Sequence, residues 1–299
     1  MPAGELAALG TATAWTGSSL AFEAAARRIG SLSLNFLRVV LALGWLTLVA
    51  TIVSGHAIPT DLTSTQWGYL LASGVVGLVL GDLCTFRAYL ELGAQRTMVF
   101  ATATPIFTAA LAWLALGETV SWLEAAGMLV IVGGVMLAIR DRVPSRQPVV
   151  GAHPIRGLLL ALGGSLGQAG GLLLSKHGLG GSSSMTSAIA ATQIRVVAGI
   201  VGFAIVLTAA RWWPKVGAAV KDGRAVALTA TGALLGPGIG VSLSLYAVTH
   251  ASAGVASALM SLTPILILPV VFARGDRIGL AGVAGAVLAV TGAIVLALA

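Results

Sequence analysis

Residues 66–93 read QWGYLLASGVVGLVLGDLCTFRAYLELG. The first sixteen carry no charge, and about 20 mostly apolar residues suffice to cross a bilayer as one helix. Asp82, Arg87 and Glu91 nevertheless lie inside the same segment. Charged side chains within a membrane segment are costly, and they usually have a partner or a function. The stretch therefore predicts a membrane-spanning helix that carries a candidate site.

The composition of the whole chain predicts an integral membrane protein. Only 9% of the 299 residues are charged, 57% are hydrophobic, and the mean hydropathy is +0.98. A globular domain carries about 25% charged residues, so a soluble fold is excluded. The net charge of +7 would suggest nucleic acid for a soluble protein. Here the basic residues fall between apolar segments, where the positive-inside rule accounts for them, so the lipid bilayer is the expected partner and nucleic acid is not.

Two further features concern processing. Cys84 is the only cysteine, so the chain cannot form an intramolecular disulfide. The first apolar segment has no basic region before it and no clear cleavage site, so we interpret it as a retained membrane span and not as a signal peptide.

Ten segments are long and apolar enough to span a membrane, which predicts an all-α membrane protein with ten transmembrane helices. The longest polar stretch lies near the middle and divides the chain into a five-helix repeat over 1–140, a cytoplasmic linker over 141–155 and a second repeat over 156–299. The ten segments are 4–25, 31–54, 66–92, 95–116, 121–139, 156–177, 184–209, 224–248, 251–273 and 278–298.

The two halves carry matching residues in the same order, which indicates an internal repeat. The matched stretches include FLRVV with QIRVV and ATPI with LTPI, and the offset between them drifts only from 153 to 159. The paired positions are Arg38 with Arg195, Pro105 with Pro264, Gly127 with Gly285, and Gly134 with Gly292.

An odd number of helices in each repeat predicts that the second copy enters the membrane with opposite polarity. Thirteen of the 17 Lys and Arg residues follow odd-numbered segments, and only Lys176 follows an even-numbered one. The other three, Arg38, Arg87 and Arg195, lie within segments. The odd-numbered loops are therefore expected in the cytoplasm and both termini outside, as two inverted copies require.

The run YLELGAQRTMVFATATPIFTAALAWLALGETVSWLEAAGMLVIVGGVMLA at 89–138 resembles the EamA domain of the drug/metabolite transporter superfamily. Residues 246–298 resemble a second copy, with GD in place of GE, and Trp15 is similar to the aromatic residue common in the first helix of the family. The resemblance implies two inverted repeats around a central cavity and transport of small metabolites, often outward, across a bacterial or archaeal cytoplasmic membrane. A monomer would suffice, and many members keep their termini inside, unlike the charge pattern here.

Asp82 is the first candidate for the substrate or ion pathway. It lies ten residues from the end of its segment at Leu92, so about 15 Å deep and near the midplane. Arg38, seven residues past Ser31, enters from the same side to a depth of about 10 Å. Two interpretations remain: a buried ion pair that fixes two helices, or a protonatable carboxylate that couples proton entry to substrate exit.

Arg195 is the counterpart of Arg38, but the position that matches Asp82 in the second repeat is Val241. Arg195 is thus free to hold a substrate carboxylate, or it bonds a backbone carbonyl.

The remaining candidates are polar or helix-breaking residues within segments. Gly236, Pro237 and Gly238 interrupt the eighth segment, and such breaks often line a transporter site or only bend a helix for packing. Pro105 and Pro264 would kink the fourth and ninth segments, as hinges or for packing. The candidates for lining a cavity are Ser242, Ser244, Tyr246, Gln168 and Trp15; the two serines could instead bond within their own helix.

The sequence contains no catalytic, metal-binding or nucleotide-binding motif, so we expect no enzyme activity, metal or cofactor. Active transport would then draw on a gradient. The prediction is a secondary transporter, such as an amino-acid or metabolite exporter that works by alternating access, with proton antiport and facilitated diffusion as alternatives. An exchanger of phosphorylated metabolites and a membrane receptor or enzyme are the other candidates.

Overall fold

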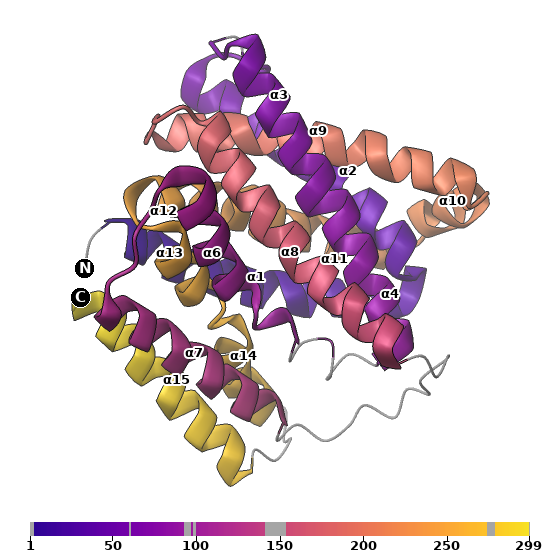
Figure 1. The fold of residues 1–299 in the computed structure, drawn as a ribbon. Coiled ribbons are helices and arrows are strands. Elements are labelled where there is room, and N and C mark those ends of the chain that lie inside the picture. The colour runs from indigo at the N-terminus through magenta and orange to yellow at the C-terminus, as the bar shows by residue number, and fades with distance from the viewer. Residues whose placement is uncertain are drawn as a thin grey trace.

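The computed structural model describes residues 3–59, 61–92, 97, 100–140, 154–273 and 279–298 (Figure 1). These residues form helices and no strand. In the first half the helices are α1 (Ala3–Ile29), α2 (Ser31–Ser54), α3 (Ser64–Ser73), the π-helix η1 (Gly74–Gly81), α4 (Asp82–Leu92), α6 (Thr104–Leu116) and α7 (Trp122–Arg140). In the second half they are α8 (Pro154–Gly178), α9 (Met185–Ala209), α10 (Trp213–Lys221), α11 (Gly223–Ala233), the π-helix η2 (Leu234–Gly240), α12 (Val241–His250), α13 (Ala253–Met260), α14 (Thr263–Ala273) and α15 (Leu280–Leu298).

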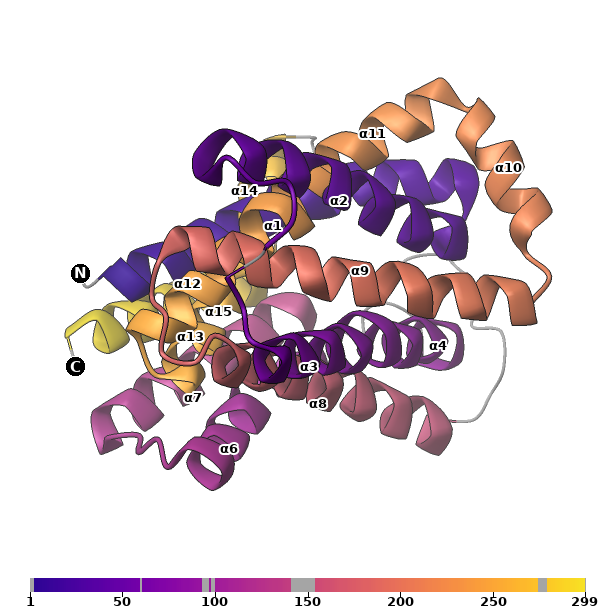
Figure 2. The same cartoon turned by 90° about the horizontal axis from the view of Figure 1, so that it is seen from above.

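Seven helical stretches in the described part are long and apolar enough to cross a membrane, and two shorter apolar helices, α6 and most of α15, accompany them. Each of the ten predicted spans overlaps described helix, although the fourth and the tenth include residues outside the described ranges. The count of ten membrane crossings therefore stays a prediction. The described chain begins and ends on the same side of the bundle (Figures 1 and 2).

The sequence analysis leaves the stretch between the predicted spans 184–209 and 224–248 as a loop, which is wrong, because Trp213–Lys221 forms helix α10. Pro214 lies in its first turn, where proline is well tolerated because the missing N–H has no helical partner. Phe36 packs edge-on against Trp213, with ring centroids 5.2 Å apart. The helix is short and only one face is buried, at Val216 and Ala219, so it lacks the continuous apolar run that identifies a span.

Helices α7 and α15 lie side by side, apart from much of the bundle, and pack through glycines (Figure 1). A Cβ atom at Gly134 would lie 2.6 Å from the Gly285 carbonyl oxygen, and one at Gly292 would lie 2.7 Å from that of Gly127. No side chain fits at these distances, so the two backbones touch. Because Gly127 matches Gly285 and Gly134 matches Gly292, exchanging the helices maps each contact onto the other. The pair is antiparallel, which is the relation expected of inverted repeats.

The same exchange relates two other antiparallel contacts between the halves. In one, Ser73 Oγ donates to the carbonyl of Gly171 on α8, 2.6 Å away. In the other, Ser18 Oγ on α1 donates to the carbonyl of Gly232 on α11, 2.9 Å away. By the repeat offsets Ser73 matches Gly232, and Ser18 matches Gly171. Each half thus places its first helix against the third helix of the other half.

Each third helix contains a π-helical segment at the matching place. The prediction of a break at Gly236–Gly238 falls within η2, whereas the sequence offered no sign of η1. π-Helical turns are rare and occur often at functional sites. Asp82 is the first residue after η1, so this irregular segment sets the direction of its side chain.

Candidate functional site

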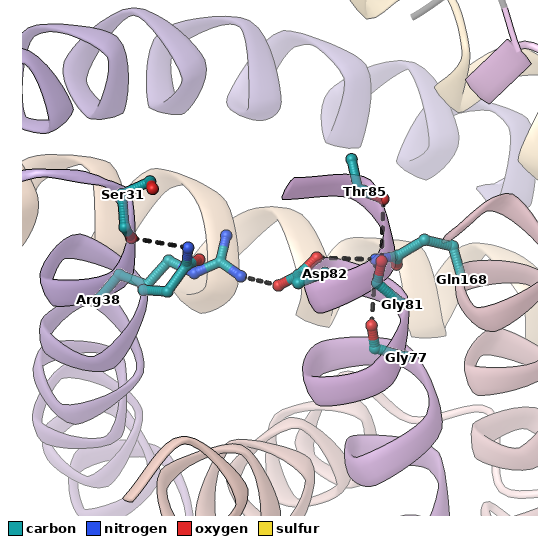
Figure 3. A network of polar contacts seen from close by, with 8 residues as sticks. Ser31, Arg38, Gly77, Gly81, Asp82, Thr85 and Gln168 are labelled. Atoms are coloured by element: carbon teal, nitrogen blue, oxygen red, sulfur yellow. Dashed lines mark hydrogen bonds and ion pairs between the residues drawn. The ribbon is translucent and has the colours of Figure 1, made fainter. Parts of the chain in front are cut away.

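Asp82 accepts hydrogen bonds from two different helices (Figure 3). Arg38 of α2 donates through Nη2 to Oδ2, and Gln168 of α8 donates through Nε2 to Oδ1 at 3.0 Å. The two donors approach the carboxylate from opposite sides (Figure 3). The side chains of Arg38 and Asp82 are 18% and 14% exposed. The ion pair predicted between Arg38 and Asp82 is therefore present and largely buried.

Gln168 connects this pair to the second half of the chain. Its Nε2 also donates to the carbonyl of Gly77 in η1, 3.1 Å away. The close approach of α8 to η1 makes this reach possible, because a Cβ atom at Gly167 would lie 2.8 Å from the Cα of Gly81. The sequence identified Gln168 as a candidate for lining a cavity, but gave no sign that it contacts Asp82.

Arg195 also lies beside η1. Its side chain comes from α9 and is only 4% exposed. A Cβ atom at Gly77 would lie 3.4 Å from Nη2, so the guanidinium rests against the π-helix. Arg195 Nε has no hydrogen-bond partner among the described residues, and the charge of Asp82 acts on it. Two buried arginines from equivalent positions therefore converge near one carboxylate.

The other predicted lining residues lie away from these contacts. Ser242 donates to the carbonyl of Gly238 at 2.7 Å and to Thr192 Oγ1 at 3.3 Å, and Ser244 donates to the carbonyl of Val241 at 2.7 Å. The bonds to Gly238 and Val241 agree with the interpretation that the two serines bond within their own helical segment and do not line a cavity. The Tyr246 ring stacks on that of His250, with centroids 4.0 Å apart.

Trp15 of α1 packs beside η2 at the position that matches that of Gln168 beside η1. A Cβ atom at Gly240 would lie 2.6 Å from the indole Nε1 of Trp15, as one at Gly81 would lie 3.4 Å from Gln168 Nε2. An aromatic ring thus packs against η2 where an amide bonds beside η1. The pseudosymmetry of the backbone is kept, but the polar chemistry of the described residues gathers at Asp82.

The predicted hinge residues fall at irregular points of the helices. Pro105 and Pro264 lie in the first turns of α6 and α14, directly after the chain leaves helical geometry at 102–103 and 261–262. Gly236, Pro237 and Gly238 lie in η2 and are buried. Their role as hinges stays a prediction.

One ion pair between the halves could not be predicted from the sequence, which shows the two charges but not their proximity. Lys176 Nζ lies 2.7 Å from Glu118 Oε1, and both side chains are about one-fifth exposed. Glu118 Oε2 accepts the backbone N–H of Ala253 at 2.8 Å, and Lys176 donates to the carbonyl of Ala251 at 3.2 Å. The pair therefore connects three segments: the turn between α12 and α13, the loop after α6 and the end of α8.

A cavity of about 200 Å³ lies apart from Asp82, between the end of α2 and the start of α9. His56, Asp61 and Gln193 contribute polar groups to its wall. Gln193 Nε2 is already bonded to Thr47 Oγ1 and to the carbonyl of Ala57. Within the described ranges, no group of three or more His, Cys, Asp or Glu side chains is arranged to hold a metal ion.

Two antiparallel helical halves with buried charges where they meet define a multi-pass membrane protein of the two-repeat transporter class. The EamA-like transporter family matches residues 2–140 and 155–298, one copy for each half. The chain belongs to this family, and through it to the drug/metabolite transporter superfamily. Members of the family are membrane transporters and not enzymes.

A solved crystal structure supports the fold independently. It aligns with a TM-score of 0.77 over 99% of this chain and 96% of its own, at 16% sequence identity. Likeness at that identity concerns the fold alone. No curated protein matches the sequence.

Proposed function

We propose that the protein is a secondary transporter of the cytoplasmic membrane that exports small metabolites, amino acids among them, by alternating access. The observation that carries this proposal is the charged cluster Arg38–Asp82–Gln168–Arg195, to which each half of the chain contributes two side chains. Buried charges in membrane proteins mark substrate and ion pathways. Sites at the interface of two repeats can face each side in turn when one repeat moves against the other.

Contacts between the halves at both ends of the bundle support alternating access. Glu118 and Lys176 pair near the ends of α6 and α8. The start of α1 lies near this pair, because Gly4 contacts His250 and Ala251. At the other end of α1, Arg28 pairs with Asp222 at 2.8 Å. Closure of one side and opening of the other would exchange such contacts.

Counterflow in proteoliposomes tests the proposal. Purified protein is reconstituted, vesicles are loaded with one unlabelled compound at a time, and entry of the same labelled compound is followed. The panel contains the L-amino acids and a set of organic cations. We expect at least one compound to accumulate transiently, with no accumulation in protein-free vesicles. A panel without any counterflow would contradict the proposed transport.

Orientation is tested by labelling single cysteines in a Cys84→Ala background. The charge pattern puts position 145 in the cytoplasm and position 182 outside, because the odd-numbered loops carry the basic residues. In intact cells, an impermeant maleimide is expected to label a cysteine at 182 and to label one at 145 only after lysis. Labelling of 145 in intact cells would reverse the proposed topology.

A further inference from the structure

The two equivalent arginines of the repeats have different electrostatic surroundings. Arg38 is neutralised by Asp82, which follows η1 in its own half. In the second half the residue after η2 is Val241, which carries no charge. Arg195 therefore receives no carboxylate from its own repeat and lies instead against Gly77 of the first repeat.

Among the described residues, the side-chain hydrogen bonds of Asp82 are made with partners other than Arg195. Oδ2 accepts from Arg38 and Oδ1 from Gln168. Arg195 is only 4% exposed, and its Nε, like that of Arg38, is buried without a hydrogen bond among the described residues. Arg38 has the ion pair with Asp82, whereas no ion pair to Arg195 is found among the described residues. A buried N–H group without an acceptor is unfavourable, and natural proteins pair nearly all such groups. This group has an unfilled requirement for an acceptor.

The charges of the cluster specify the kind of acceptor. Two guanidiniums and one carboxylate leave one positive charge among the four residues. A single carboxylate would balance that charge and match the planar donor edge of arginine. A phosphate dianion would add excess negative charge next to Asp82. The cluster thus fits a monoanion better than a phosphate ester.

We infer that Arg195 is the binding residue for a substrate carboxylate, so that the transported compounds are small monocarboxylates or amino acids. This inference rests on the proposed transport function and narrows it. In the conformation described here the guanidinium is closed from solvent, so the carboxylate reaches it when the halves open. A Cβ atom at Gly77 would lie 3.4 Å from Nη2, so the guanidinium lies against the backbone of η1.

The test compares each L-amino acid of the panel with its carboxamide, which keeps the side chain and amine but lacks the negative charge. Binding is measured as the thermal stabilisation of purified protein in detergent. We expect at least one amino acid to stabilise the wild type and its carboxamide to have no effect. Arg195→Gln is expected to raise the apparent Kd at least tenfold, and Arg195→Lys to raise it less, since charge remains without the planar fork.

Two control variants separate binding from folding. Arg27→Gln removes one positive charge from the exposed ion pair with Glu23 within α1 and is expected to leave the Kd unchanged. Arg38→Gln, at the equivalent position of the first repeat, leaves Asp82 without its ion-pair partner and is expected to lower the melting temperature without ligand. Arg195→Gln removes an uncompensated charge and is expected to keep or raise it.

Several results would overturn the inference. They are unchanged affinity in Arg195→Gln, equal binding of amino acids and carboxamides, no stabilisation by any carboxylate, or stabilisation by inorganic phosphate alone. Counterflow of organic cations without any carboxylate would refute the substrate class and leave the transporter function intact. Failure of every counterflow assay would instead refute the transport function itself.

Discussion

Asp82→Asn is expected to lower the free energy of unfolding by about 3–5 kcal/mol, the cost of removing one partner from a buried ion pair. Asparagine keeps the shape but not the charge, so Arg38 would remain buried without its carboxylate partner. Thermal unfolding of purified protein in detergent, followed by size-exclusion chromatography after heating, measures the loss.

A double variant separates the ion pair from the fold. Asp82→Asn combined with Arg38→Gln removes both members of the pair and is expected to recover part of the lost stability. The charge swap, Arg38→Asp with Asp82→Arg, should also give partial rescue. A melting temperature of Asp82→Asn equal to that of the wild type would contradict a structural role for the pair.

The double variant also tests proton coupling, the second interpretation of Asp82. If the carboxylate carries protons, the variant is expected to retain counterflow, which needs no net proton movement, and to lose accumulation driven by a pH gradient. A folded variant that still concentrates substrate against its gradient would exclude Asp82 from coupling.

Gly171→Ala is expected to have the second largest effect, because α8 and η1 touch at this residue. The added Cβ would lie 2.7 Å from the Cα of Gly77 and 3.2 Å from the carbonyl oxygen of Ser73, and neither backbone atom can rotate away. Forced separation of packed elements costs about 1–3 kcal/mol. Loss of the hydrogen bond from Ser73 to Gly171 would add about 1 kcal/mol.

Gly170→Ala is the matched control. The nearest neighbour of its added Cβ would be the Val76 side chain, at an ordinary contact distance of 3.5 Å. Alanine also favours the helix over glycine by up to about 1 kcal/mol, so this variant is expected to be as stable as the wild type or more so. Equal melting temperatures for the two variants would show that α8 and η1 adapt to the added methyl group.

The membrane spans could be predicted from the sequence because bilayer thickness sets their length. The predicted span 31–54 coincides with α2, and 184–209 differs from α9 by one residue. Helix α10 was missed because its nine residues lie between spans and only one face is buried. Segment η1 was missed because GVVGLVLG contains no proline, whereas Pro237 drew attention to η2.

The candidate site was predictable only in part. The cost of burying Asp82 and the depth of Arg38 predicted their pairing, since both follow from chain position alone. Which glycine of a Gly-Gly pair faces a neighbour does not follow from spacing: a Cβ atom at Gly164 would overlap the side chain of Thr85, whereas one at Gly163 would lie 3.7 Å from Cys84 Sγ. The contact between Gln168 and Asp82 depends on that register, and so it could not be derived.

Segment η1 couples the winding of one helix to the direction of Asp82. A π-helical stretch accommodates an additional residue compared with an α-helix of the same length. Rewinding η1 to α-helical geometry would turn the following residues about 100° around the helix axis and shift them about 1.5 Å along it. That screw motion would carry Asp82 away from Arg38 and Gln168 together, while α8 and α2 stayed in place. The winding of the eight residues before Asp82 thus determines which helices the carboxylate contacts.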